Sequence, residues 1–169
     1  MKKQHLFHLA FFGALLLLLT GCMKKQSYPD TPQISLISFE TISDTNQVVR
    51  YGILGIDYQD GNGDIGLDPG DTFPPYDRNG PYYYNYVINF FEKQNGVFNQ
   101  VDLTIPFSLR IPVLTPDNPN RAIKGFMYDT MTLYPPPVHD TIKFQVFIYD
   151  RSLNKSNVIT TPEIILKRH

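Results

Sequence analysis

Apolar and polar residues alternate along several short stretches of this chain, which is the pattern of half-buried β-strands. The clearest case is the stretch 141–150, where every second position is apolar: Ile142, Phe144, Val146 and Ile148. Similar stretches occupy residues 33–40, 48–58, 82–92, 97–103, 107–113, 122–133 and 158–166. After residue 22, no segment keeps the 3.6-residue period of an amphipathic helix. The chain is therefore predicted to be all-β.

Short turn sequences separate these stretches. Asn95-Gly96 is the strongest of them, because both residues accept the positive φ angles of a two-residue hairpin turn. The stretch 107–113 carries Pro106 and Pro112, which suits a strand at the edge of a sheet. About seven strands joined by such turns predict an antiparallel β-sandwich or barrel.

The first 22 residues carry the features of an export signal. Lys2 and Lys3 precede an apolar run at 6–19, which is shorter than the roughly 20 residues of a membrane-spanning helix. The following Leu19-Thr20-Gly21-Cys22 resembles the lipobox of bacterial lipoproteins, whose cysteine is lipidated and becomes the new N-terminus. We expect residues 1–21 to be a signal peptide and Cys22 to carry the lipid. An uncleaved anchor helix is the alternative.

The segment after the lipobox is expected to be a spacer. Residues 22–32 are polar and contain Pro29 and Pro32, so we predict a flexible tether between the lipid and a domain that spans residues 33–169. Met23, rather than an aspartate, follows the cysteine. In the sorting rule of other Gram-negative bacteria this is compatible with a lipid anchor in the outer membrane. The side of that membrane, periplasmic or outer, is left open.

Composition narrows the classes of partner. Removing residues 1–21 from 169 leaves 148 residues, which is enough for a single hydrophobic core. The removed segment holds two lysines and no acid, so the net charge falls from −1 to −3. A weakly acidic chain without a basic run gives no reason to expect a nucleic acid partner. Cys22 is the only cysteine, so no disulfide can form within the chain.

One stretch concentrates candidate metal ligands. Residues 60–71 contain four aspartates, one asparagine and four glycines, with no basic side chain. Carboxylate, amide and carbonyl oxygens are the ligands of Ca²⁺ in proteins. Read with the spacing of an EF-hand loop, the ligands are Asp60, Asn62, Asp64, Gly66 through its carbonyl, Asp68 and Asp71. We predict a structural calcium ion in this loop.

The loop departs from the EF-hand pattern in two ways. Ile65 occupies the position where that pattern has glycine, and Asp71 replaces a longer glutamate that binds with both oxygens. No helix is predicted on either side. A calcium loop between strands is therefore expected, rather than an EF-hand. The alternative is that these side chains only cap their own tight turns.

Other candidate chemistry is limited. Tyr76, Tyr82 and Tyr83 are candidates for an aromatic platform that binds a sugar or a peptide, although such residues can also be ordinary core and surface. Beyond the signal segment only His139 and His169 remain as histidines, and their spacing does not suit a zinc site. The chain has no Gly-x-Ser-x-Gly motif. We therefore predict that the protein is not an enzyme.

Two resemblances support this interpretation. The final stretch 140–166 is similar to the last two strands of immunoglobulin-like and fibronectin type III-like domains, in which an alternating strand ends in Tyr-Asp before a polar turn. The lipobox, the tether and the loop Asp-Gly-Asn-Gly-Asp-Ile-Gly-Leu together resemble small uncharacterised lipoproteins of the Bacteroidetes group. The resemblance implies an envelope location and an immunoglobulin-like sandwich, and no activity. The tryptophan and paired cysteines of antibody domains are missing, so only the architecture is shared.

Two functions follow from these expectations. The first is a non-catalytic binding or accessory module, held to the membrane by its N-terminal lipid, that binds a glycan, a peptide or an envelope protein through its loops. The second is a structural subunit of a larger outer-membrane assembly. A concave group of tyrosines beside the acidic loop would favour the first. An exposed edge strand without proline would favour the second.

Overall fold

The computed structural model describes residues 27–115, 121–133 and 137–166. The predicted signal peptide and the lipidation site Cys22 lie outside these residues. Within them the chain is all-β, as predicted, and contains no helix. The strands are β1 (Gln33–Ser43), β2 (Val49–Asp60), β3 (Tyr86–Gln94), β4 (Val97–Gln100), β5 (Ile123–Thr132), β6 (Thr141–Ile148), β7 (Ile159–Thr160) and β8 (Ile164–Ile165).

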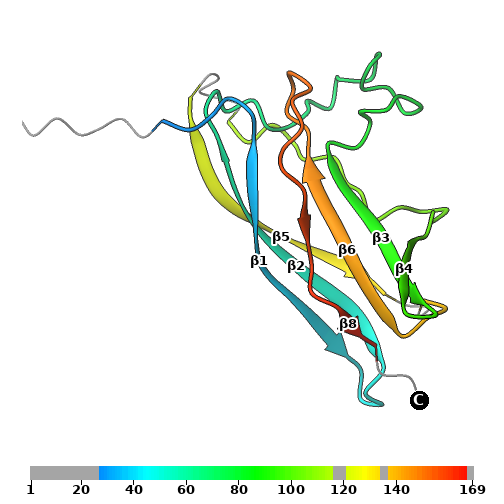
Figure 1. Cartoon of the computed structure of the whole chain (residues 1–169). Helices are drawn as coiled ribbons and strands as arrows, with labels where there is room; N and C mark the ends of the chain where they lie inside the picture. The colour runs from blue at the N-terminus through cyan, green and yellow to red at the C-terminus, as the bar shows by residue number, and fades with distance from the viewer. Residues whose placement is uncertain (1–26, 116–120, 134–136, 167–169) are drawn as a thin grey trace, which may run out of the picture.

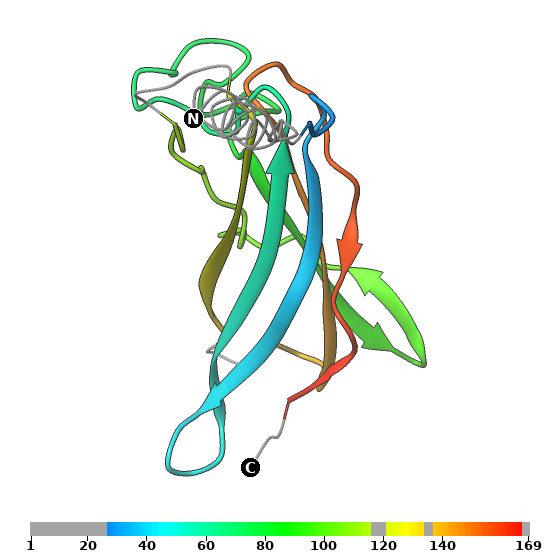
Figure 2. The ribbon, with the colours of Figure 1, turned by 90° about the vertical axis from the view of Figure 1, so that its left-hand side faces the viewer.

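The strands form two antiparallel sheets that face each other (Figure 1). The first sheet has the order β1-β2-β5, and the second has the order β4-β3-β6-β7, with β8 also pairing with β6. Figure 2 shows the β3–β4 hairpin extending away from the body of the sandwich. A helix long and apolar enough to cross a membrane does not occur among the described residues.

The core lies between the sheets. The alternating residues of β6 behave as predicted, since Ile142, Phe144, Val146 and Ile148 are all fully buried. Phe144 is the central contact, because its ring stacks on Phe39 of the opposite sheet at a centroid distance of 5.3 Å. Rings of Phe90 and Phe107 lie 5.5 Å from it. The contact of Phe39 with Phe144 therefore joins the two sheets within a largely aliphatic core.

The predicted hairpin turn is confirmed. Asn95 and Gly96 have φ angles of 51° and 83°, which are the left-handed values of a type I′ turn. The turn connects β3 to β4, which pair from Gln94 and Val97 onward.

The predicted edge strand at 107–113 is wrong. This segment makes only isolated bridges, Leu109 with Tyr86 and Pro112 with Leu67. Side-chain hydrogen bonds supplement the backbone pairing at these bridges: the buried Asn85 amide donates to the Ile111 carbonyl (3.2 Å) and accepts from the Ile111 amide (2.6 Å). The prolines that border the segment lack the N–H groups that a continuous ladder needs.

The closing strand is also interrupted. The predicted stretch 158–166 forms the two short strands β7 and β8, with Pro162 between them. Thr161 bridges the gap, because its hydroxyl accepts from the Phe144 amide (3.0 Å) while its own amide donates to the Phe144 carbonyl (2.9 Å). A buried threonine side chain thus continues the pairing with β6 where proline breaks it.

The folded domain begins earlier than predicted. Pro32 is fully buried, and the carbonyl of Pro29 accepts a hydrogen bond from the Gly61 amide (2.7 Å). The end of the expected tether is therefore part of the domain and lies against the acidic loop. Pro29 and Pro32 are held against the domain, whereas Asp30 and Thr31 between them are exposed.

Candidate metal centre

Three aspartates come together at the end of the sandwich where β2 and β6 end. Asp60 is the last residue of β2, Asp64 lies in the loop that follows, and Asp150 follows β6. One carboxylate oxygen from each lies within 4.8 Å of the other two. Oxygen atoms at these separations can bind a single hard cation.

Burial makes this cluster more than a group of surface acids. The Asp60 side chain is 0% exposed, and that of Asp150 is 1% exposed. The Oδ1 atoms of Asp60 and Asp64 are both buried and have no hydrogen-bond partner. An unpartnered buried carboxylate oxygen is costly, and a bound cation would remove that cost.

The raised pKa values of two of these carboxyl groups also favour a bound cation. Burial, followed by repulsion from Asp64, raises the pKa of Asp60 to about 6. Burial also raises the pKa of Asp150, although hydrogen bonds from Asn154 oppose that increase. A divalent ion would reverse both effects, because an adjacent positive charge favours the ionised form of a carboxyl group.

Turn capping accounts for part of the acidic loop, as the alternative interpretation expects. Asp60 Oδ2 accepts from the Asp64 amide (2.9 Å), and Asn62 Oδ1 accepts from the same amide at 3.4 Å. In a separate turn, Asp68 Oδ1 accepts from the Gly70 amide (2.8 Å). Capping leaves the second oxygen of Asp60 unsatisfied. Turn formation alone therefore does not account for this residue.

The cluster of three does not include Asp68 or Asp71, which the sequence pattern had placed among the ligands. Asp71 is engaged elsewhere: its Oδ1 accepts from Arg151 (2.8 Å) and its Oδ2 from the Asp68 amide (2.7 Å). The cause is the apolar pair Ile65 and Leu67, which are 0% and 3% exposed. Because these two side chains are buried in the core, the residues that follow them, Asp68 and Asp71, lie outside the cluster.

Gly66 is placed by packing. Its φ angle is +121°, and a Cβ atom there would lie 2.3 Å from the Pro112 carbonyl oxygen. Beside it, the Leu67 amide donates to the Ile111 carbonyl (2.9 Å). The glycine therefore lets the acidic loop lie directly on the segment 109–114. Its predicted role as a carbonyl ligand stays a prediction.

Asp150 is the ligand candidate that sequence reasoning missed. It was interpreted only as the end of a strand and the start of a polar turn. The turn that follows Asp150 is hydrogen-bonded to the acidic loop. Ser152 Oγ donates to Asp64 Oδ2 (2.6 Å), and the Arg151 amide donates to the Asp64 carbonyl (3.0 Å). One signal was available, because Asp60 and Asp150 each stand at the carboxyl end of a strand. Which strand ends meet in space is decided by the sheet order.

The candidate tyrosines lie half-buried in a segment next to the acidic loop. The Tyr76 hydroxyl donates to the Arg151 carbonyl, and Tyr82 packs edge-on against Tyr149 at 4.9 Å. Tyr83 lies between the ring of Tyr84 (4.8 Å) and the guanidinium of Arg110 (5.0 Å). The three rings therefore contact different neighbours, and their role as a ligand platform stays a prediction.

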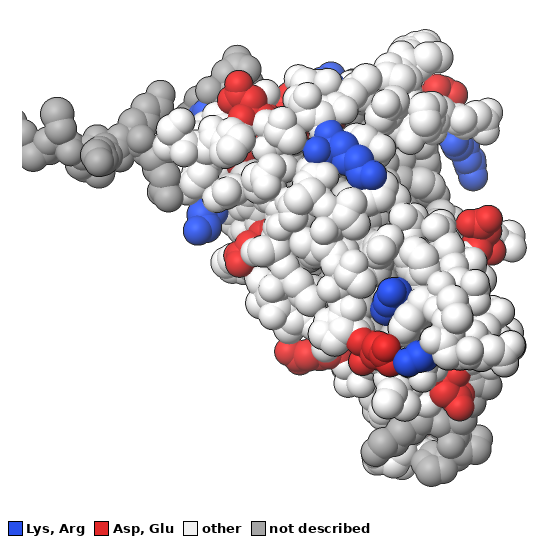
Figure 3. All heavy atoms as spheres, in the orientation of Figure 1, with Lys and Arg blue, Asp and Glu red and all other residues white. Residues whose placement is uncertain are grey.

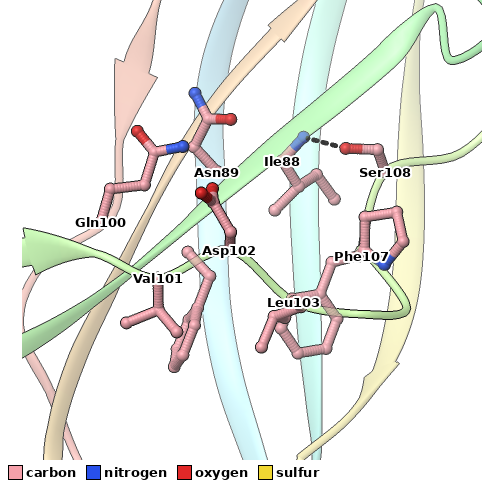
Figure 4. Close-up of a pocket in the computed structure, with 10 residues that line it drawn as sticks. Ile88, Asn89, Gln100, Val101, Asp102, Leu103, Phe107 and Ser108 are labelled. Carbon is pink, nitrogen blue, oxygen red and sulfur yellow. Dashed lines mark hydrogen bonds between the residues drawn. The ribbon is translucent and has the colours of Figure 1, made fainter.

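The rest of the visible surface is less distinctive. On the face in Figure 3, basic and acidic side chains are interspersed. A hollow of 130 Å³ lies between β3 and the segment 100–108 (Figure 4). Its wall is fixed by the Ile88 amide, which donates to Ser108 Oγ (3.0 Å). This volume is below the roughly 300 Å³ at which ligand pockets begin.

Comparison with known proteins gives no relative: no protein-family model matches the chain, and no curated protein or solved structure does so significantly.

Proposed function

We propose that this protein is a lipid-anchored envelope protein whose immunoglobulin-like domain is a non-catalytic binding or accessory module stabilised by calcium. The observation that carries the calcium centre is the group of Asp60, Asp64 and Asp150, in which Asp60 and Asp150 are buried and two carboxylate oxygens have no partner. Oxygen-only ligands suit a hard cation such as Ca²⁺. Because Asp60 and Asp150 are buried, the ion would be structural, joining the ends of the two sheets.

The strand order supports the immunoglobulin-like class. A sheet of β1-β2-β5 facing a sheet of β4-β3-β6-β7 is the arrangement expected of a fibronectin type III-like sandwich, with β7 and β8 as one interrupted closing strand. The class describes architecture and does not by itself define a function.

The envelope location rests on the N-terminal sequence. The apolar run and the Leu19-Thr20-Gly21-Cys22 pattern support lipidation, and Pro29 brings the chain onto the domain beside the acidic loop. The calcium centre therefore lies at the end of the domain to which the predicted anchor connects. In the proposed arrangement, the ion keeps this end folded beside the membrane.

The second function, a structural subunit, is favoured by one observation. Strand β5 is ten residues long, contains no proline and pairs only with β2 among the described residues. Its side chains Phe126 and Tyr128 are 69% and 57% exposed. Such an edge can pair with another chain.

Calcium titration tests the proposal. The purified full-length protein should melt roughly 5 to 10 °C higher with calcium at about 100 times its dissociation constant than with a chelator. Asp60→Asn should lose this shift, because it removes a buried ligand charge. Asp77→Asn, in the neighbouring loop, should keep it. An equal shift in both variants would show that calcium acts elsewhere, and the absence of any shift would overturn the centre.

A further inference from the structure

A groove of 400 Å³ opens beside strand β5, and none of the three clustered aspartates lines it. Four consecutive residues, 126–129, form one wall, and the segment 109–112 forms the other. Side chains of consecutive strand residues alternate between faces, so a wall made of four in a row is the edge of the strand. Its free edge therefore presents backbone donors and acceptors to the groove.

Nothing in the described part of the chain pairs with this edge. The register joins β5 to β2 from Ile123 to Thr132 on one side, and no other strand lies beyond it in the sheet order. At the lip, Phe126 and Tyr128 expose most of their rings and contact each other at 5.9 Å. Edges of this length and polarity are the templates on which extended peptides add a strand.

The floor of the groove carries two polar groups, Tyr86 and Asp129, and the hydroxyl of Tyr86 has no partner. Tyr86 is 2% exposed, and its hydroxyl is buried without a hydrogen-bond partner. Asp129, on the inward face of β5, lines the same groove and lies near enough to raise the pKa of Tyr86 further. Burial raises the pKa of Asp129 itself. No lysine or arginine of the described residues forms an ion pair with Asp129.

Arg110 does not neutralise this floor, although it lines the groove. Its guanidinium is turned to the other side, where it donates to the carbonyls of Tyr83 (2.9 Å) and Asp71 (3.1 Å). The groove thus offers an apolar wall, a free strand edge and, at its floor, a carboxylate and a phenol oxygen. The carboxylate of Asp129 only accepts hydrogen bonds when it is ionised, and the phenol oxygen of Tyr86 can accept one as well as donate, so a cationic donor can satisfy both.

We propose that the groove binds an extended peptide segment of a partner protein, which pairs with the edge of β5 and inserts a lysine or arginine side chain toward Asp129 and Tyr86. This deepens the proposed binding function and rests on it, but it uses a surface separate from the calcium centre. Backbone pairing supplies affinity, and the basic side chain supplies selectivity. Neighbouring apolar side chains of the peptide would contact Met127 and Leu114.

The test uses the full-length protein in mild detergent with saturating calcium and a fluorescent peptide, Thr-Val-Thr-Lys-Thr-Val-Thr. Fluorescence anisotropy should show binding. Replacing the peptide lysine by norleucine should weaken binding about tenfold, since a charge-assisted hydrogen bond is lost. Asp129→Asn should weaken the lysine peptide by a similar factor and remove its advantage over norleucine. The matched control Asp57→Asn, on the opposite face of the same sheet, should change nothing.

Backbone pairing has its own signature. N-methylation at alternate peptide positions should abolish binding in one register and leave it intact in the other, because only alternate N–H groups of an added strand face its partner. Should Asp129→Asn fail to fold, the norleucine peptide and the variant Tyr86→Phe still test whether the peptide lysine binds at the floor of the groove.

Three results would overturn the peptide site: equal binding of the lysine and norleucine peptides, equal weakening by Asp57→Asn, or no binding at all. Dimerisation through β5 that the peptide cannot compete with would also overturn it, by making a second copy the occupant. Calcium-dependent melting, measured on the same samples, separates this failure from failure of the calcium centre.

Discussion

The carboxylates of Asp60 and Asp150 lie in one group with that of Asp64, although Asp60 ends a strand of one sheet and Asp150 follows a strand of the other. An ion held between them would link the two sheets at one end of the sandwich. The aromatic contact of Phe39 with Phe144 links the same sheets through the core. This arrangement explains how two loops far apart in the chain form one unit.

Calcium stabilisation should depend on Asp150 as much as on the acidic loop. We expect Asp150→Asn to abolish most of the calcium-induced increase in melting temperature, because one of three carboxylates is lost. Asp68→Asn, at an exposed turn position outside the cluster, should leave the increase within about 1 °C of the wild-type value. Differential scanning calorimetry with calcium and with chelator measures both. If Asp150→Asn keeps the full calcium-induced increase in melting temperature, the ion is bound by residues of the loop 60–71 without Asp150.

Without metal, stability should fall as pH rises through the titration of Asp60. Burial and Asp64 raise the folded-state pKa of Asp60 to about 6, above the ordinary 3.8, so the folded state binds the proton more tightly than the unfolded state. Its contribution is present below pH 4 and lost between about pH 4 and 6. In chelator, the melting temperature of the wild type should therefore decrease across this window relative to Asp60→Asn.

Calcium should reverse that trend, because the ion competes with the proton for the same carboxylate. The calcium-induced shift should be small at pH 4.5 and largest above pH 6.5. A calcium shift that is independent of pH would argue against Asp60 as a ligand.

The aromatic core should be sensitive at Phe144. Its fully buried ring contacts Phe39, Phe90 and Phe107, so Phe144→Ala should lower the free energy of unfolding by about 3 to 5 kcal/mol. Phe73→Ala is the control, since Phe73 is 77% exposed and should change stability by less than about 0.5 kcal/mol. Urea unfolding compares the two. Similar losses would show that the aromatic core is not where the structure places it.

Asn85 should act as a clamp on the segment 107–113. Asn85→Ala leaves the Ile111 amide without its partner, while the Ile111 carbonyl keeps the hydrogen bond from the Leu67 amide, and it should cost about 1 to 3 kcal/mol. Amide hydrogen exchange at Ile111 should accelerate along with this loss. The exposed Asn99, whose amide makes a weak local contact at 3.4 Å, is the control. If Ile111 remains protected in Asn85→Ala, the clamp is not the group that holds it.

Lipidation is expected at Cys22, because its thiol follows Leu19-Thr20-Gly21 at the end of an apolar export signal. Cys22→Ser should accumulate as an unprocessed precursor that takes up no labelled fatty acid. Thr20→Ser, a small change inside the same motif, should still be labelled. Label on the Cys22→Ser protein would refute the predicted anchor.

The sequence by itself determined the local features. Strict alternation in β6 indicated which side chains are buried, and Asn95-Gly96 indicated the hairpin, because backbone preference and side-chain direction depend on near neighbours. The concentration of acids at 60–71 pointed to Asp60 and Asp64, because these two aspartates are close together in the sequence. Prolines were less well interpreted: the segment 107–113 forms isolated bridges rather than a strand, and the buried Asn85 holds Ile111 by side-chain hydrogen bonds.

Only the tertiary structure decided which candidate ligands meet. Ile65 and Leu67 are buried because a core is there to receive them, and this carries Asp68 and Asp71 away from the cluster. Asp150 joins the cluster because the strand order brings the ends of β2 and β6 to one end of the sandwich. Such an approach depends on long-range packing between sheets, which leaves no periodic trace along the chain. Among the described residues the first sheet ends at β5, and only this strand order leaves its edge open.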